Sequence, residues 1–179
     1  MIRRLPAIIP SNFFTKMASR NTIQMYLTTV VAIVILLAAS QATEARFTSL
    51  CAQTAYPTLC RPLVKGPNPR RATHSTIRAL EAKTKLAITD SARFKSGNPT
   101  VAICYATLVD ASFNLRRART SIRKRNVMML KMFLTAAVSD YGVCVNGFID
   151  SHQVNTLQND VDELRKMGTN CLLLATLIR

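Results

Sequence analysis

The chain lacks the residue patterns on which most catalytic sites are built. Its 179 residues include no tryptophan, five glycines and two histidines, and they show no phosphate-binding loop, nucleophile elbow, paired-carboxylate motif or internal repeat. Neither His74 nor His152 stands with a carboxylate or cysteine at metal-ligand spacing, and a zinc site needs about three or four convergent ligands. Thr73-His74-Ser75 lacks the separated acid and the oxyanion loop of a catalytic triad. We therefore expect no catalytic residue, no metal and no cofactor.

Long apolar runs are rare, and the one near the N-terminus is short. Residues 26–39 form an apolar run of fourteen that follows four basic side chains, whereas a membrane span needs about 20 residues. Small residues come next, so cleavage after Ala42 or Ala45 is expected. We interpret the first 45 residues as a cleaved secretory signal peptide with a basic leader. If translation begins at Met17 or Met25, this leader is shorter. An uncleaved signal anchor is the alternative; after cleavage the protein would be secreted, extracellular and not membrane-anchored.

Acidic side chains are scarce. The chain has 24 Lys and Arg residues against 9 Asp and Glu, a net charge of +15. Without residues 1–45, four basic side chains and one acidic one are lost, which leaves 20 − 8 = +12 on 134 residues, enough for one domain with a single core. Such a surface attracts polyanions. For a secreted protein we expect an acidic polysaccharide or a negatively charged protein as partner, and no nucleic acid.

Apolar residues recur at alternating spacings of three and four, which is typical of amphipathic helices. No segment shows a sustained period-two pattern, so strands are not expected. Asn98 and Pro99 predict a helix start, since asparagine caps a helix and proline fits its first turn. The predicted helices are Thr73–Phe94, Pro99–Arg123, Asn126–Phe148 and a fourth from Asn155 or Thr156 to the C-terminus.

These four helices predict an all-α fold, an up-down-up-down four-helix bundle over residues 73–179. Residues 46–72 differ, because Cys51 and Cys60 bracket a Tyr-Pro turn that interrupts two short helical stretches. We expect a disulfide-linked α-helical hairpin here, followed by a stiff, proline-rich linker to the first long helix. Residues 46–179 would thus form one domain.

The remaining cysteines lie on the apolar sides of the predicted helices. Cys104 and Cys144 are centred on Lys124, which lies in the polar stretch where the second and third helices would reverse. Two antiparallel helices would therefore bring the two thiols level, as suits a compartment where disulfides persist. Cys171 is left over; it is expected to be a buried free thiol, with an intermolecular bridge as the alternative.

Four stretches that contain the cysteines form a recognisable pattern. They are Cys51-Ala-Gln-Thr-Ala-Tyr-Pro-Thr-Leu-Cys60, Cys104-Tyr-Ala-Thr-Leu-Val-Asp-Ala-Ser-Phe-Asn-Leu115, Leu134-Thr-Ala-Ala-Val-Ser-Asp-Tyr-Gly-Val-Cys144-Val-Asn-Gly-Phe148 and Thr169-Asn-Cys-Leu172. Together they resemble the plant invertase and pectin methylesterase inhibitor family. The resemblance covers the chain from Phe47 to Leu177.

This resemblance implies a secreted inhibitor that lies across the active-site cleft of a cell-wall enzyme, bound 1:1 and without catalysis. It also implies disulfides Cys51–Cys60 and Cys104–Cys144. Pectin methylesterase inhibitors commonly carry two acidic residues and a threonine where this chain has Ala106, Asn146 and Val143. The invertase branch is associated with a Pro-Lys-Phe motif that is absent here, so pectin methylesterase is the favoured target and invertase the alternative.

Two groups of surface residues are candidates for binding. The first would contact the target enzyme, with ordinary solvent-exposed surface as the alternative: Tyr105, Thr107, Asp110, Asn114, Val143 and Asn146, beside which Lys131 and Asp140 also face away from the predicted core. The second is a candidate anion patch for acidic pectin, made by Arg116, Arg117 and Arg119. The alternative for the patch is a solvated helix face whose charges meet the negative end of the helix dipole. A polyanion-binding protein on the same scaffold is therefore the alternative function.

Overall fold

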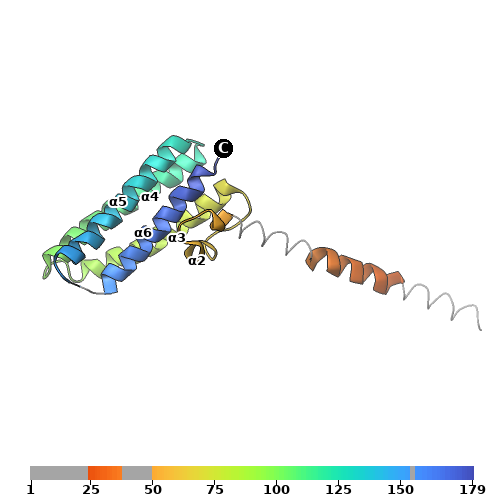
Figure 1. The fold of residues 1–179 in the computed structure, drawn as a ribbon, viewed down its shortest axis with the longest axis horizontal. Helices are drawn as coiled ribbons and strands as arrows, with labels where there is room; N and C mark the ends of the chain where they lie inside the picture. The colour runs from red at the N-terminus through yellow and green to blue at the C-terminus, as the bar shows by residue number, and fades with distance from the viewer. Residues whose placement is uncertain (1–23, 38–49, 154–155) are drawn as a thin grey trace, which may run out of the picture. The chain divides into compact units, whose positions relative to one another are not determined.

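The computed structural model describes residues 24–37, 50–153 and 156–179 (Figure 1). The chain divides into two compact units, Met1–Ala42 and Thr43–Arg179. In the first unit, a helix at Gln24–Leu37 carries exposed apolar side chains along its length. The second unit holds the remaining described helices and both disulfides. The predicted cleavage positions, Ala42 and Ala45, lie outside the described residues.

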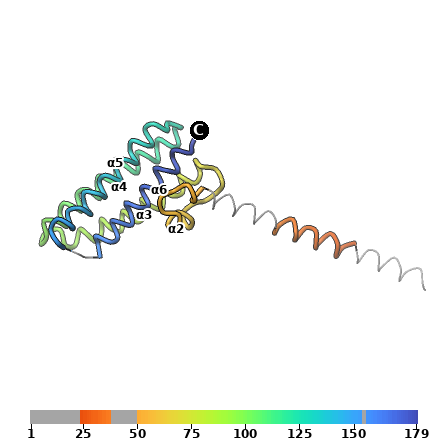
Figure 2. Tube along the Cα trace, viewed as in Figure 1, coloured from red at the N-terminus to blue at the C-terminus, as the bar shows by residue number. Residues whose placement is uncertain are grey.

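Four long helices form the bundle: α3 (Pro69–Ala92), α4 (Pro99–Arg123), α5 (Val127–Asp150) and α6 (Thr156–Thr176). Each packs against two others, in the pairs α3 with α4, α4 with α5, α5 with α6 and α3 with α6. Consecutive helices run in opposite directions, and short turns join α3 to α4 and α4 to α5 (Figures 1 and 2). The described residues contain no strand. This arrangement confirms the predicted up-down-up-down bundle.

Asparagine caps set the start of three of these helices. The Asn98 and Asn126 side chains accept hydrogen bonds from backbone N–H groups of α4 and α5. Asn68 does the same for α3, accepting from Arg70 and Arg71. Consequently α3 begins at Pro69, four residues before the predicted start, and Pro69 opens the helix where an extended linker was expected. The last helix ends at Thr176, before the C-terminus.

Both expected disulfides are present. Cys104 and Cys144 join α4 to α5 in the core, with a Cα–Cα distance of 4.4 Å. Cys51 and Cys60 close the N-terminal hairpin, which includes the short helix α2 (Pro57–Cys60), with a Cα–Cα distance of 5.6 Å. The bundle and its leading hairpin are therefore each closed by one covalent bridge.

The side chain of Asn170 attaches this hairpin to α6. Its Oδ1 accepts a hydrogen bond from the Tyr56 N–H at 3.0 Å, and its Nδ2 donates to the Tyr56 carbonyl at 2.8 Å. Asn170 is fully buried, so both bonds are shielded from water. A small second core under the hairpin consists of Leu50, Cys51, Cys60, Val64, Ala72 and Leu174.

The main core lies between the four long helices and also contains buried polar side chains. The Tyr141 hydroxyl is 2.6 Å from the Thr84 hydroxyl, which links α5 to α3. Gly168 permits a close approach, since a Cβ there would lie 2.8 Å from Cγ2 of Val138. Cys171 is buried and free, as expected, and burial raises the pKa of its thiol to about 12.

Among the described helices, α5 alone is long and apolar enough to cross a membrane. It is a core helix of the bundle, however, because it packs against both α4 and α6. Its buried side includes Leu130, Leu134, Tyr141 and Phe148. The apolar character of α5 is therefore explained by the bundle core together with an outward-facing apolar surface described below.

Candidate functional site

Two stripes of residues meet on the outer side of α4 and α5. On α4, Ile103, Thr107, Asp110 and Asn114 recur at spacings of four, three and four, which places them on one side of the helix. On α5, Met132, Ala136, Asp140 and Val143 recur at spacings of four, four and three, which also places them on one side of the helix. We call these two stripes together the α4–α5 face.

A hydrogen bond joins the two stripes across the helix boundary. Nδ2 of Asn114 donates to Oδ2 of Asp140 at 2.9 Å, and both side chains are half-buried. Burial raises the pKa of the Asp140 carboxyl, the hydrogen bond from Asn114 opposes the rise, and the negative charge of Asp110 adds to it. The face therefore has an acidic centre in an otherwise basic protein.

Exposed apolar side chains lie along the same two stripes as this acidic centre. The exposed fractions are 55% for Ile103, 50% for Met132 and 48% for Val143. Phe113 on α4, at 49%, lies beside the same face and contacts Arg117. Apolar side chains that no part of the bundle covers are typical of protein-binding surfaces. The disulfide Cys104–Cys144 fixes α4 and α5 to each other beneath them.

Most of the predicted enzyme-contact residues lie on or beside this face. Thr107, Asp110, Asn114 and Val143 belong to it, and Asn146 is exposed one turn beyond Val143 on α5. Tyr105 is different, since its ring faces Lys95 of the α3–α4 turn, with Nζ 4.0 Å from the ring centroid. It therefore lies on the flank of α4 toward α3. Ala106 and Lys131 are exposed and half-buried, respectively.

The three arginines of the predicted anion patch point in different directions. Nε of Arg119 lies 3.3 Å from Oε1 of Glu81 on α3. The Arg117 guanidinium lies over the Phe133 ring of α5, 4.5 Å from its centroid. Arg116 is exposed between these two directions. The structure thus does not bring the three guanidinium groups to one side of α4.

The exposed apolar residues Ile103, Phe113 and Met132 were not among the sequence candidates. Their signal was available, because each is a large apolar residue outside the three-four core pattern of its helix. Basic residues on α3 were missed for a different reason: Arg70, His74 and Arg78 are separated by four positions and form no run in the sequence.

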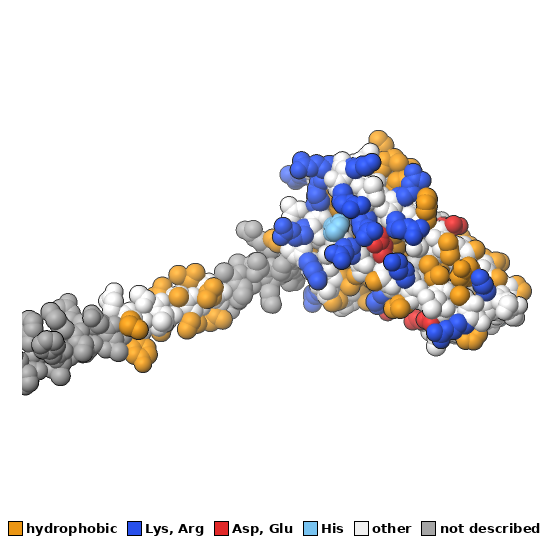
Figure 3. Space-filling view, turned by 180° about the vertical axis from the view of Figure 1, so that it is seen from behind, with side chains coloured by type: hydrophobic (Ala, Val, Ile, Leu, Met, Phe, Trp, Pro, Cys, Tyr) orange, Lys and Arg blue, Asp and Glu red, His pale blue; other side chains and the backbone are white. Residues whose placement is uncertain are grey.

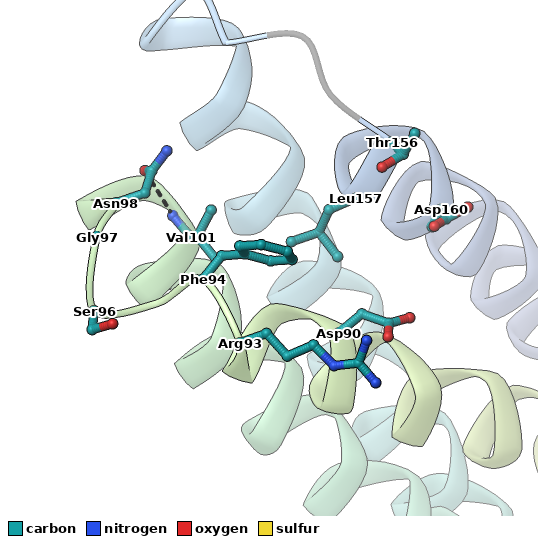
Figure 4. A pocket seen from close by; sticks show the side chains of 10 residues that line it. All are labelled: Asp90, Arg93, Phe94, Ser96, Gly97, Asn98, Val101, Thr156, Leu157 and Asp160. Atoms are coloured by element: carbon teal, nitrogen blue, oxygen red, sulfur yellow. Dashed lines mark hydrogen bonds between the residues drawn. The ribbon is translucent and has the colours of Figure 1, made fainter.

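A hollow of about 670 Å³ lies between the α3–α4 turn and the start of α6. Figure 4 shows the Phe94 ring extending toward Leu157, with Asp90 and Asp160 on neighbouring helices. Asn98 is engaged there in capping α4. Within the part of the chain that the structure describes, no group of three or more potential metal ligands occurs.

A helical bundle with a disulfide-tied pair of helices and an uncovered apolar face defines a binding protein. The model of the family "Plant invertase/pectin methylesterase inhibitor" matches residues 45–174, and the chain belongs to this family of proteinaceous inhibitors, which are not enzymes.

Solved structures support the fold. A pectin methylesterase inhibitor from Arabidopsis, in a mutant form A, aligns with a TM-score of 0.67 at 14% identity, covering 74% of this chain and 97% of the other. A second Arabidopsis thaliana pectin methylesterase inhibitor aligns with a TM-score of 0.60 at 15% identity, covering 75% and 97%. No curated protein was found to match the chain.

Proposed function

We propose that this protein is a secreted inhibitor of a plant pectin methylesterase, and that it binds the enzyme 1:1 through the α4–α5 face. The observation that carries the proposal is the exposed apolar surface around the Asn114–Asp140 pair. Burying apolar area stabilises a complex by about 25 cal/mol per Å², while the paired polar groups fix orientation. Bound across the active-site cleft, the bundle would exclude the polymeric substrate.

Rigidity supports an inhibitor of this kind. The bridge Cys104–Cys144 and the hydrogen bond Asn114–Asp140 hold both helices in register before binding. A preorganised surface loses little conformational entropy on association, so more of the contact free energy appears as affinity.

The choice of target rests on sequence features. The chain contains no Pro-Lys-Phe motif, which favours the esterase branch over the invertase branch, and invertase remains the alternative target. Ala106, Val143 and Asn146 are all exposed, so they are available to a partner. At these positions the contact would be less acidic than is common among pectin methylesterase inhibitors. The target surface expected here is correspondingly more apolar.

Secretion is supported by two observations. The Gln24–Leu37 helix is apolar, exposed and shorter than a membrane span, as suits a signal peptide. The match to the family model begins at residue 45, next to the expected cleavage position. Removal of this segment would release the disulfide-bonded unit into the apoplast, where the bridges persist.

A titration tests the proposal directly. The protein, expressed from its full-length chain and recovered with both disulfides oxidised, is titrated against a plant pectin methylesterase and an acid invertase near cell-wall pH. We expect stoichiometric inhibition of the esterase. Val143→Arg on the α4–α5 face should weaken inhibition at least tenfold, because it places a charge in the apolar contact. Leu86→Arg, at another exposed apolar position but on α3, is the control and should change it less than twofold.

Full inhibition of the invertase alone would move the proposal to its alternative target. Absence of inhibition of both enzymes at large molar excess would contradict it altogether. Equal losses for Val143→Arg and Leu86→Arg would exclude the α4–α5 face as the binding surface.

A further inference from the structure

Basic side chains concentrate at the end of the bundle where α3 begins and α4 ends. A hollow of about 470 Å³ there is lined by Arg70, Arg71, His74, Arg123 and Arg125 together with Asn68 and Ile122. Figure 3 shows Lys and Arg side chains crowded on one part of the surface, with few acidic groups among them. We call this region, extended by Arg78 and Arg119, the α3–α4 groove.

The groove has two facing columns of charge. Arg70, His74 and Arg78 recur every four residues along α3, and Arg119 and Arg123 do so on α4. The pKa of His74 is lowered by burial and by the positive charges of Arg78, Arg119 and Arg123, so both columns act on the same imidazole. The α3 column spans eight residues, about 12 Å at 1.5 Å per residue.

Little in the protein neutralises these charges. Glu81, 9% exposed, is the one carboxylate in ion-pair contact with a groove arginine within the described residues, and it pairs with Arg119. Nη1 of Arg70 donates to the Ile122 carbonyl at 3.4 Å, where it meets the negative end of the α4 dipole. Arg71, Arg78, Arg123 and Arg125 remain exposed and are not in ion-pair contact with a described carboxylate.

We propose that the α3–α4 groove binds a linear acidic polysaccharide, de-esterified pectin, through its carboxylates. A column of charge this long exceeds what a single small anion occupies, whereas a chain with a carboxylate on each sugar can meet arginines on successive helical turns. Arginine suits this ligand because its planar guanidinium pairs bidentately with carboxylates. No Phe, Tyr or Trp lines the hollow, so it lacks the stacking platform typical of single-stranded nucleic acid binding.

The choice of pectate among polyanions rests on the proposed function, because an esterase acting on methyl-esterified pectin leaves carboxylates on the polymer. The groove lies on the flank of α4 toward α3, and the α4–α5 face lies on the flank toward α5. The protein would therefore bind de-esterified pectin and the esterase at the same time. Since de-esterified pectin is the product of the esterase, the inhibitor would be retained where the enzyme has acted.

The experiment measures binding of an oligogalacturonate of about ten sugars to the full-length-expressed protein by calorimetry, at low and at raised salt. We expect binding that weakens steeply with salt. The fully methyl-esterified oligomer should bind at least tenfold more weakly. The double variant Arg78→Glu/Arg123→Glu should lose at least tenfold in affinity. Arg61→Glu/Arg93→Glu removes the same charge from exposed positions elsewhere and should lose less than threefold.

Equal binding of the esterified and de-esterified oligomers would overturn the proposal, as would equal losses for the two double variants. Tighter binding to anionic lipid vesicles or to duplex DNA than to the oligogalacturonate would overturn the choice of ligand. Melting temperatures of all variants verify folding, and the milder pair Arg78→Gln/Arg123→Gln replaces the first if it does not fold. Oligogalacturonate binding without enzyme inhibition would contradict the proposed inhibitor function and support the groove as a polysaccharide site. Enzyme inhibition without oligogalacturonate binding would support the inhibitor function and contradict the groove proposal.

Discussion

The two flanks of α4 differ in chemistry although they share one helix. Toward α5, the helix presents Ile103 and the Asn114–Asp140 pair, an apolar surface with an acidic centre. Toward α3, it presents Arg119 and Arg123 above His74 in a basic groove. The difference shows that a net charge of +15 describes neither surface. We assign the attraction of polyanions to the α3–α4 groove and the contact with a protein partner to the α4–α5 face.

The two flanks also differ in how they are held together. The α4–α5 side has a covalent bridge and a neutral-to-charged hydrogen bond. On the α3–α4 side, the polar contacts are the ion pair between Arg119 and Glu81 and the hydrogen bond from Arg70 to the Ile122 carbonyl. Buried or half-buried ion pairs contribute little net stability but are costly to break on one side. Mutations should therefore act on the two flanks in different ways.

The largest expected effect comes from removing the bridge beneath the α4–α5 face. Cys104→Ala/Cys144→Ala opens a loop of sequence separation 40 and should lower the free energy of unfolding by about 4 kcal/mol on the chain-entropy model. Cys51→Ala/Cys60→Ala, with a separation of 9, should cost less, about 3 kcal/mol. Urea unfolding measures both. A larger loss for the hairpin bridge would contradict the ordering.

Removal of the Cys104–Cys144 bridge should also affect the functions of the two flanks unequally. At temperatures where the Cys104→Ala/Cys144→Ala variant stays folded, enzyme inhibition should fall more than oligogalacturonate binding, because only the α4–α5 face loses its covalent tie. Equal proportional losses would indicate that the bridge acts through the whole bundle.

The difference between the flanks explains what the sequence could and could not predict. Helix number, order and core positions followed from spacing, since a wrong residue in a packed interior is destabilising. The helix start at Asn98 was found because the cap and Pro99 are adjacent to a clear break. At Asn68 the same signal lay in a proline-rich stretch and was interpreted as linker.

The surface patches were harder to predict because neighbours in sequence diverge on a helix. Arg116 and Arg117 are about 100° apart around α4, so a run of arginines does not make one patch. Conversely, Arg70 and Arg78 join the residues of α4 only through tertiary packing. The α4–α5 candidates were largely located because the cysteines beside them fix the direction of both helices.

A smaller effect on stability is expected from Glu81→Gln. This variant should change the stability of the fold and the affinity of the groove for oligogalacturonate in opposite directions. Loss of the carboxylate leaves Arg119 without its partner and should destabilise the fold by about 1 to 3 kcal/mol. The same change removes a negative charge that pairs with a groove arginine, so oligogalacturonate affinity should rise about threefold. Urea unfolding and calorimetry measure the two. Thr89→Gln, an exposed position on α3, serves as control.

Reduced oligogalacturonate affinity in Glu81→Gln would indicate that Glu81 positions Arg119 for the ligand. Unchanged stability would show that the ion pair does not hold α3 against α4.

The smallest expected effects concern pH, and they have opposite signs on the two flanks. The pKa of His74 is lowered from 6.5 in the folded protein, so below 6.5 the unfolded chain binds this proton more readily and stability falls as the pH drops through that window. The pKa of Asp140 is raised from 3.8, so just above 3.8 the folded state binds the proton more readily, and stability gains as the pH falls. His74→Gln and Asp140→Asn should flatten these two slopes separately.

Ligand binding sharpens this last contrast. A carboxylate chain in the groove would offset the charges of Arg78, Arg119 and Arg123 and therefore raise the pKa of His74 toward its ordinary value. Nuclear magnetic resonance titration of the imidazole signals measures the shift. His152, the other histidine, lies beyond the C-terminal end of α5 and is the internal control; the variant His152→Gln assigns the two signals. Because His74 lines the groove and His152 does not, an oligogalacturonate-induced shift of both histidines would reveal diffuse attraction to the basic protein in place of a site.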